Sequence, residues 1–157
     1  MRYVCLLILA LLPRPADACS IPYIPMFQIF DRAAIVAQSR GAQDNGKVVL
    51  RVVHAFKGSP GNAIRLDHKI RGPHSSCDPH LKGRSVGIVY LTKDLRFAAA
   101  YDSLPKGTKA LVAAISAYAK ATDAKSRAAV LVDLMNGGGE HRIVYDAGLS
   151  LADDPAA

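Results

Sequence analysis

The feature that most constrains the fold is a change in hydrophobic period at Pro105. Before it, the stretch 47–57 (KVVLRVVHAFK) alternates apolar and polar positions, which is the period of a strand with one buried face. After it, apolar residues recur at the spacing of one helix face: Leu111, Ala114, Ile115 and Tyr118. The sequence therefore predicts a β part followed by a helical part.

Five stretches before Pro105 have the pattern of strands: 33–39, 47–57, 64–69, 85–92 and 95–101. Asp44-Asn45-Gly46 is a strong turn signal between the first two. Five antiparallel strands can close into a small Greek-key barrel of the OB type, which removes exposed sheet edges. We therefore expect a mainly β fold with C-terminal helices, in which residues 19–104 form a five-stranded OB-type barrel. Residues 105–157 are expected to pack on it as helices, with no helix before Pro105.

The region 105–157 carries start and stop signals for its helices. Thr122 or Asp123 can cap the second helix, and the glycines at 137–139 can end it. A third, short helix is indicated by apolar residues at a spacing of four: Ile143, Ala147 and Leu151.

The first eighteen residues have the pattern of a secretory signal peptide. Arg2 gives a positive start, residues 4–12 are a short apolar run, and Ala16-Asp17-Ala18 is a small-x-small cleavage site. The run is too short to span a bilayer, and no other stretch approaches the ~20 apolar residues that a membrane helix needs. We expect a mature chain that begins at Cys19, is secreted or periplasmic, and has no membrane span.

Removal of this leader takes Cys5 with it and leaves two cysteines, Cys19 and Cys77. An even count in an exported chain predicts one disulfide. This bridge would close a loop of about sixty residues and contribute roughly 4 kcal/mol to stability. The alternative is a lipid anchor on Cys19, which would leave Cys77 unpaired.

A further possibility for Cys77 is a metal site shared with His74 and His80. Two imidazoles and a thiolate are zinc ligands, and three ligands could leave a fourth position open. Pro73 and Pro79 prevent a helix from presenting the three together. The spacing alone is a weak signal, and we expect no cofactor.

The mature chain is basic. Without Arg2, Arg14 and Asp17 it keeps 18 basic and 12 acidic residues, a net charge of +6. Such a domain favours anionic partners, of which an anionic surface or polysaccharide fits an exported protein better than nucleic acid. The basic residues on predicted wet faces of strands are Arg51, Lys57, Arg65 and Lys69.

The mature start, CSIPYIPMFQIFDRAAIVAQSRG, resembles the opening of the tissue inhibitors of metalloproteinases, which also begin at a cysteine followed by a small hydroxyl residue. The stretches VVLRVVHAFKG and SSCDPHLKGRSVGIVYL resemble two further parts of that family. The resemblance covers roughly residues 19–102 and implies a netrin-like domain, which is an OB-type barrel.

The resemblance also implies a mechanism. In that family, the free amine and the carbonyl of the first cysteine chelate the zinc of a secreted metalloprotease and displace its water. On this chain the role falls to Cys19, held in place by its bridge to Cys77. Ser20 would enter the specificity pocket of the protease, and Ser75 and Ser76 would belong to the contact ridge.

A second function stays open. The vertebrate inhibitors carry further cysteines close behind the first, and here Ile21 stands at such a position. An exported OB-type binding or adhesion module would need only the barrel and no inhibitory activity. We do not expect an enzyme, because the sequence contains no nucleophile motif, no His-Glu zinc signature and no paired carboxylates.

Overall fold

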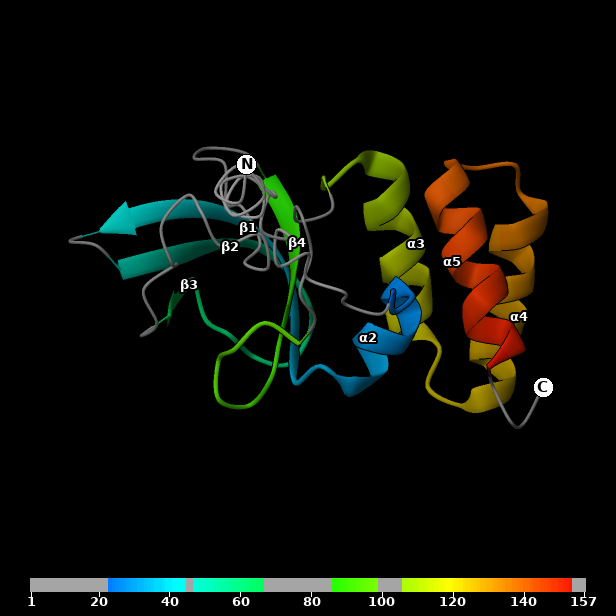
Figure 1. Cartoon of the computed structure of the whole chain (residues 1–157), viewed down its shortest axis with the longest axis horizontal. Helices are drawn as coiled ribbons and strands as arrows, with labels where there is room; N and C mark the ends of the chain where they lie inside the picture. Colours follow the sequence, from blue (N-terminus) through cyan, green and yellow to red (C-terminus); the bar gives the residue numbers. More distant parts are fainter. Residues whose placement is uncertain (1–22, 45–46, 67–85, 99–105, 154–157) are drawn as a thin grey trace, which may run out of the picture.

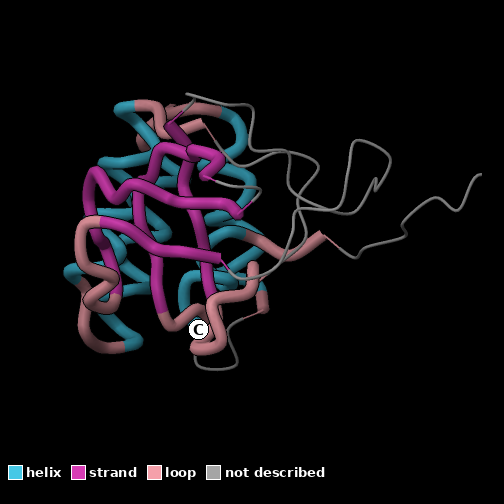
Figure 2. The backbone as a smooth tube through the Cα atoms, turned by 90° about the vertical axis from the view of Figure 1, so that its left-hand side faces the viewer, coloured by secondary structure: helices cyan, strands magenta, loops and turns pink. Residues whose placement is uncertain are grey.

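The computed structural model describes residues 23–44, 47–66, 86–98 and 106–153. They form two layers, an antiparallel sheet and a set of helices on one side of it (Figures 1 and 2). The strands are β1 (Ile35–Asp44), β2 (Lys47–Lys57), β3 (Ala63–Leu66) and β4 (Val86–Leu91). The helices are α2 (Met26–Arg32), α3 (Lys109–Lys120), α4 (Ala124–Asn136) and α5 (His141–Ala152).

The sheet has the strand order β3-β2-β1-β4. The strand predicted over 47–57 is confirmed as β2, which pairs with β1 along its whole length. The pairing shifts register twice, between Val36 and Ala37 and between Gln38 and Ser39, and each time β2 carries the one extra residue; bulges of this kind bend and twist a strand. Beyond these shifts, β1 and β2 reach away from the helices (Figure 1).

The predicted five-stranded barrel is wrong. The described residues form an open sheet of four strands, in which β3 and β4 lie at opposite edges. In place of a fifth strand, the chain turns back directly after β4, with Leu95 at a φ of 55° and a hydrogen bond of 3.1 Å from its N–H to the Thr92 carbonyl. Phe97 forms a single β-bridge with Leu91, and residues 99–105 lie outside the described residues.

The expectation of no helix before Pro105 is also wrong, because α2 precedes the first strand. Four of its seven residues are buried: Met26, Phe27, Ile29 and Phe30. This spacing covers one helix face, and it packs into the core that α2 shares with the other helices and the sheet. Pro25 stands at the N-cap, where its missing N–H costs the helix nothing.

The helices predicted after Pro105 are confirmed. The Thr108 side chain caps α3 by accepting a hydrogen bond of 3.1 Å from the Leu111 N–H. Asp123 caps α4 in a capping box with Ser126, and Gly137 ends that helix. Hydrogen bonds from the Ser126 backbone and side chain hold the pKa of the Asp123 carboxyl below its usual value.

Apolar residues are buried on both faces of the sheet. The core between sheet and helices contains Val36, Ile88 and Tyr90 of the strands and includes Tyr118, whose ring lies 4.9 Å from that of Phe27. The opposite face carries a second cluster: Ala37, Val48, Leu50, Ile64, Leu66, Val89 and Leu91. At the end of β2, Gly58 has a φ of 76°, and a Cβ there would meet the Ala34 carbonyl at 2.6 Å, so this turn requires glycine.

Candidate functional site

The residues that the sequence predicted as a site all lie outside the described residues: Cys19, Ser20, His74, Ser75, Ser76, Cys77 and His80. The disulfide, the chelating terminus and the weak metal alternative therefore stay predictions. Within the described ranges, no group of three His, Cys, Asp or Glu side chains could hold a metal ion. No helix in those ranges is long and apolar enough to cross a membrane.

Three arginines from three neighbouring strands lie together on one face of the sheet. Arg40 of β1 pairs directly with Arg51 of β2. Arg65 of β3 pairs with Val49, two residues from Arg51, and is therefore the diagonal neighbour of Arg51. All three are exposed. Because adjacent strands lie about 4.8 Å apart, these three charges cover roughly 10 Å of sheet, and we call them the arginine face.

The arginine face continues the side of the sheet that the helices cover elsewhere. The pairing of β1 with β4 places Arg40 on the same side as Val36, whose side chain is in the core shared with the helices. Past the register shifts, β1 and β2 extend beyond the helical layer (Figure 1). The arginines therefore lie where this side of the sheet becomes open.

Among the side chains that the structure describes, which do not include those of residues 42–47, no acidic group pairs with the arginine face. The ion pair found there, between Arg127 and Asp31, is in the helical layer, and none involves Arg40, Arg51 or Arg65. Like charges directly opposite each other on two strands are destabilising. An uncompensated row of arginines is therefore more typical of a site for an anionic ligand than of a structural element.

Lys57 does not belong to this open surface, although its position in β2 predicted a wet face. Its ammonium donates to the Phe30 carbonyl at 2.8 Å and to the Asp31 carbonyl at 2.9 Å, and it lies 5.2 Å from the centre of the Phe30 ring. Desolvation by burial lowers the pKa of Lys57. Its role is to bind the last carbonyls of α2, a favourable position for a cation.

Tyr23 and the first residue of α2 are fixed to α5 through a buried carboxylate. Asp146 is completely buried, and it accepts hydrogen bonds from the Tyr23 hydroxyl and, at 3.0 Å, from the Met26 N–H. Burial, together with the hydrogen bond to Asp146, raises the pKa of Tyr23 to about 12. Cys19 precedes this fixed point by only four residues, and four residues can span at most about 14 Å.

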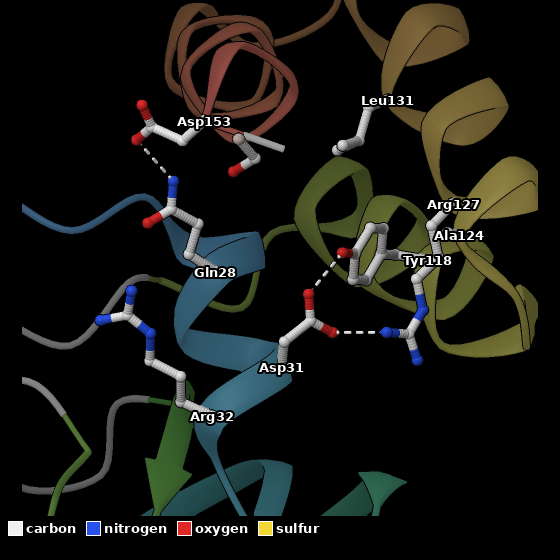
Figure 3. Close-up of a pocket in the computed structure, with 9 residues that line it drawn as sticks. Gln28, Asp31, Arg32, Tyr118, Ala124, Arg127, Leu131 and Asp153 are labelled. Carbon is white, nitrogen blue, oxygen red and sulfur yellow. Dashed lines mark hydrogen bonds and ion pairs between the residues drawn. The ribbon is translucent and has the colours of Figure 1, made fainter. Parts of the chain in front are cut away.

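A pocket of about 620 Å³ lies among the four helices (Figure 3). Its lining residues are Gln28, Asp31, Arg32, Tyr118, Ala124, Arg127, Leu131, Ser150 and Asp153. Asp31 accepts hydrogen bonds of 2.8 Å from both Tyr118 and Arg127, and Gln28 donates to Asp153 at 2.9 Å. No sequence pattern predicted this site, because its α2 residues lie at least 86 positions before the lining residues of the other helices.

Neither a protein-family model nor a curated protein nor a solved structure matches the chain. Its function is therefore inferred from the geometry of the described residues and from the sequence.

Proposed function

We propose that this chain is an exported, non-catalytic binding domain that attaches to an anionic polysaccharide through the arginine face. The observation that carries the proposal is the direct pairing of Arg40 with Arg51, without an acidic partner among the described residues. A folded domain that keeps two like charges in one cross-strand pair gives up stability, and binding of anions would offset that loss. The basic mature chain, with its charge of +6, supports the same class of ligand.

The shape of the arginine face favours an extended polymer. Three guanidinium groups on adjacent strands offer successive contacts to a chain that crosses the strands, and each can bind a carboxylate or sulfate with two hydrogen bonds. Single-stranded nucleic acid would need aromatic side chains on which its bases stack. Besides Arg40, the neighbours of Arg51 on this face are Val49 and Ala63, neither of which is aromatic, and the nearest ring further along β2 on the same face is the imidazole of His54, opposite Gln38.

The experiment is a binding measurement with a sulfated polysaccharide and with neutral dextran of the same length. The proposal requires binding to the sulfated polymer alone, weakened by salt and by replacement of the three arginines. Vesicles with anionic lipid form a second arm. Tighter binding to vesicles than to the polymer would assign the arginine face to a lipid surface instead.

A second candidate function is inhibition of a secreted zinc metalloprotease by the free terminus of Cys19. The specific observation in its favour is the anchoring of Tyr23 and Met26 by Asp146. A chelating terminus loses affinity when it must be ordered on binding, so a fixed point four residues behind it reduces that cost. The bridge between Cys19 and Cys77 would add a second restraint. This candidate does not require a barrel, because the anchor here is a helix.

A further inference from the structure

We propose that the pocket among the helices binds a short peptide with free ends, of about dipeptide size. Its volume of about 620 Å³ falls within the range of small-ligand sites, which is about 300–1,000 Å³. The proposal is independent of the arginine face, because the two sites share no residue.

Two of the four charged residues that line the pocket neutralise each other. Asp31 accepts from Arg127 through one carboxylate oxygen and from the Tyr118 hydroxyl through the other, both at 2.8 Å. Arg127 also donates to the Ala121 carbonyl at 3.1 Å and lies over the Tyr118 ring. This pair is a fixed wall of the pocket, so recognition of a charged ligand falls to Arg32 and Asp153.

Arg32 and Asp153 carry opposite charges that the described residues leave uncompensated. Arg32 is exposed and forms no hydrogen bond or ion pair within the described part of the chain. Asp153 stands at the C-cap of α5, where the helix dipole is negative, and its side chain receives a hydrogen bond from the neutral amide of Gln28. The Arg32 guanidinium therefore suits a ligand carboxylate, and the Asp153 carboxylate suits a ligand ammonium.

The placement of Arg32 one helical turn from Gln28, which contacts Asp153, suits a ligand of about dipeptide length. Gln28 and Arg32 are four residues apart on α2, which is about 6 Å along a helix, and Gln28 is in hydrogen-bond contact with Asp153. Two residues of extended peptide span about 7 Å between their ends. Figure 3 shows Gln28 between Arg32 and Asp153, on the side of the pocket that faces Leu131 across the cavity.

The rest of the lining suits the middle of a peptide. Ser150 is 7% exposed, and its buried hydroxyl has no hydrogen-bond partner among the described residues, so it can bond a ligand amide. Leu131, Ala124 and the ring of Tyr118 provide an apolar wall for one side chain. The pocket therefore offers a complement for each part of a dipeptide with an apolar residue.

The test is an NMR titration of the mature protein with three probes: alanyl-leucine, its N-acetylated form and its C-terminal amide. We expect alanyl-leucine to bind at least about tenfold more tightly than either capped form, which corresponds to the loss of one charged contact. In Arg32→Gln the free and amidated peptides should bind equally. In Asp153→Asn the free and acetylated peptides should bind equally. Arg96→Gln and Asp133→Asn are charge-matched controls outside the pocket and should behave as wild type.

Two results would overturn the inference. Equal binding of free and capped peptides would show that Arg32 and Asp153 do not bind the charged ends of the ligand. A concentration of about 10 mM alanyl-leucine lies well above the Kd of a weak specific complex, which is about 1 mM. Unchanged spectra at that concentration would show that the pocket does not bind peptides. Neither result would bear on the arginine face, whose own test uses polysaccharide.

Discussion

Arg40 on β1 lies directly opposite Arg51 on β2, so that two positive charges form one cross-strand pair on an exposed part of the sheet. Arg65 on the next strand is the diagonal neighbour of Arg51. Within a sheet, such an arrangement opposes folding, and it persists here without an acidic partner in the described part of the chain. The repulsion should therefore be measurable as a loss of stability.

Replacing Arg51 with Gln should stabilise the protein. The substitution removes the like-charge contact with Arg40, and we expect the free energy of unfolding to rise by about 0.2–1 kcal/mol at low salt. The gain should shrink as salt screens the repulsion in the wild type. Urea denaturation at two salt concentrations measures both effects. Arg51→Lys keeps the charge and serves as the control. A loss of stability in Arg51→Gln that does not depend on salt would contradict the repulsion.

The Tyr23 hydroxyl should contribute stability that is lost at alkaline pH. Its pKa is about 12 in the folded protein, against about 10 for an unperturbed tyrosine, so the folded state holds the proton more tightly. The contribution is complete below pH 10 and falls as the pH rises toward 12. At pH 8 we expect Tyr23→Phe to be less stable by about 1 kcal/mol. Unfolding of both proteins from pH 8 to 12 tests this, and a difference that stays constant over the range would refute it.

The mature protein should begin at an unmodified Cys19 bridged to Cys77. Its intact mass would then be two hydrogens below that of the reduced chain. Cys77→Ser should lower the free energy of unfolding by about 2–5 kcal/mol, the usual cost of losing a native disulfide. N-terminal sequencing and mass spectrometry of the exported protein measure the first point. A diacylglycerol adduct on Cys19, or a free Cys77 thiol, would contradict the disulfide and favour the lipid anchor.

One extra alanine ahead of Cys19 should abolish any inhibition of zinc proteases. It converts the terminal amine into an amide, which is a poor zinc ligand at neutral pH, and it leaves the Asp146 anchor unchanged. Ser20→Gly should instead alter which proteases are inhibited. The assay compares the mature and extended proteins on a panel of secreted zinc proteases. Equal inhibition by both forms would exclude chelation. No inhibition by either form would leave polysaccharide binding through the arginine face as the proposed function.

Much of the arginine face could be predicted from the turn signal alone. The turn signal at 44–46 predicts a two-residue hairpin loop, and that loop length gives the register found in the strands: Asp44 pairs with Lys47 and, counting outward, Arg40 pairs with Arg51. The sequence also contains the signal for α2, since apolar residues at 26, 27, 29 and 30 cover one helix face. The helix is only seven residues long, and at that length the apolar pattern alone does not separate a helix from a strand.

The rest of the structure depends on contacts that no local pattern specifies. The apolar positions Leu95 and Phe97 have the spacing of a strand, but they pack against the second core from a turn. Asp146 is an ordinary acidic residue of a helix in the sequence, and its partners Tyr23 and Met26 lie at least 120 positions away. The pocket likewise joins residues of four helices. These long-range contacts explain why the helical site was not predicted.

The binding of a sulfated polysaccharide by two charge-matched variants tests the central claim most directly. One variant replaces the arginine face (Arg40→Gln, Arg51→Gln and Arg65→Gln), and the other replaces three exposed lysines of the helical layer (Lys109→Gln, Lys120→Gln and Lys125→Gln). Both lose three positive charges, so a difference between them reports position and not net charge. We predict that the first variant binds at least about tenfold more weakly than wild type, a change of about 1.4 kcal/mol, and that the second stays within about threefold. Equal loss in the two variants, or retention of binding in the first, would contradict a site at the arginine face.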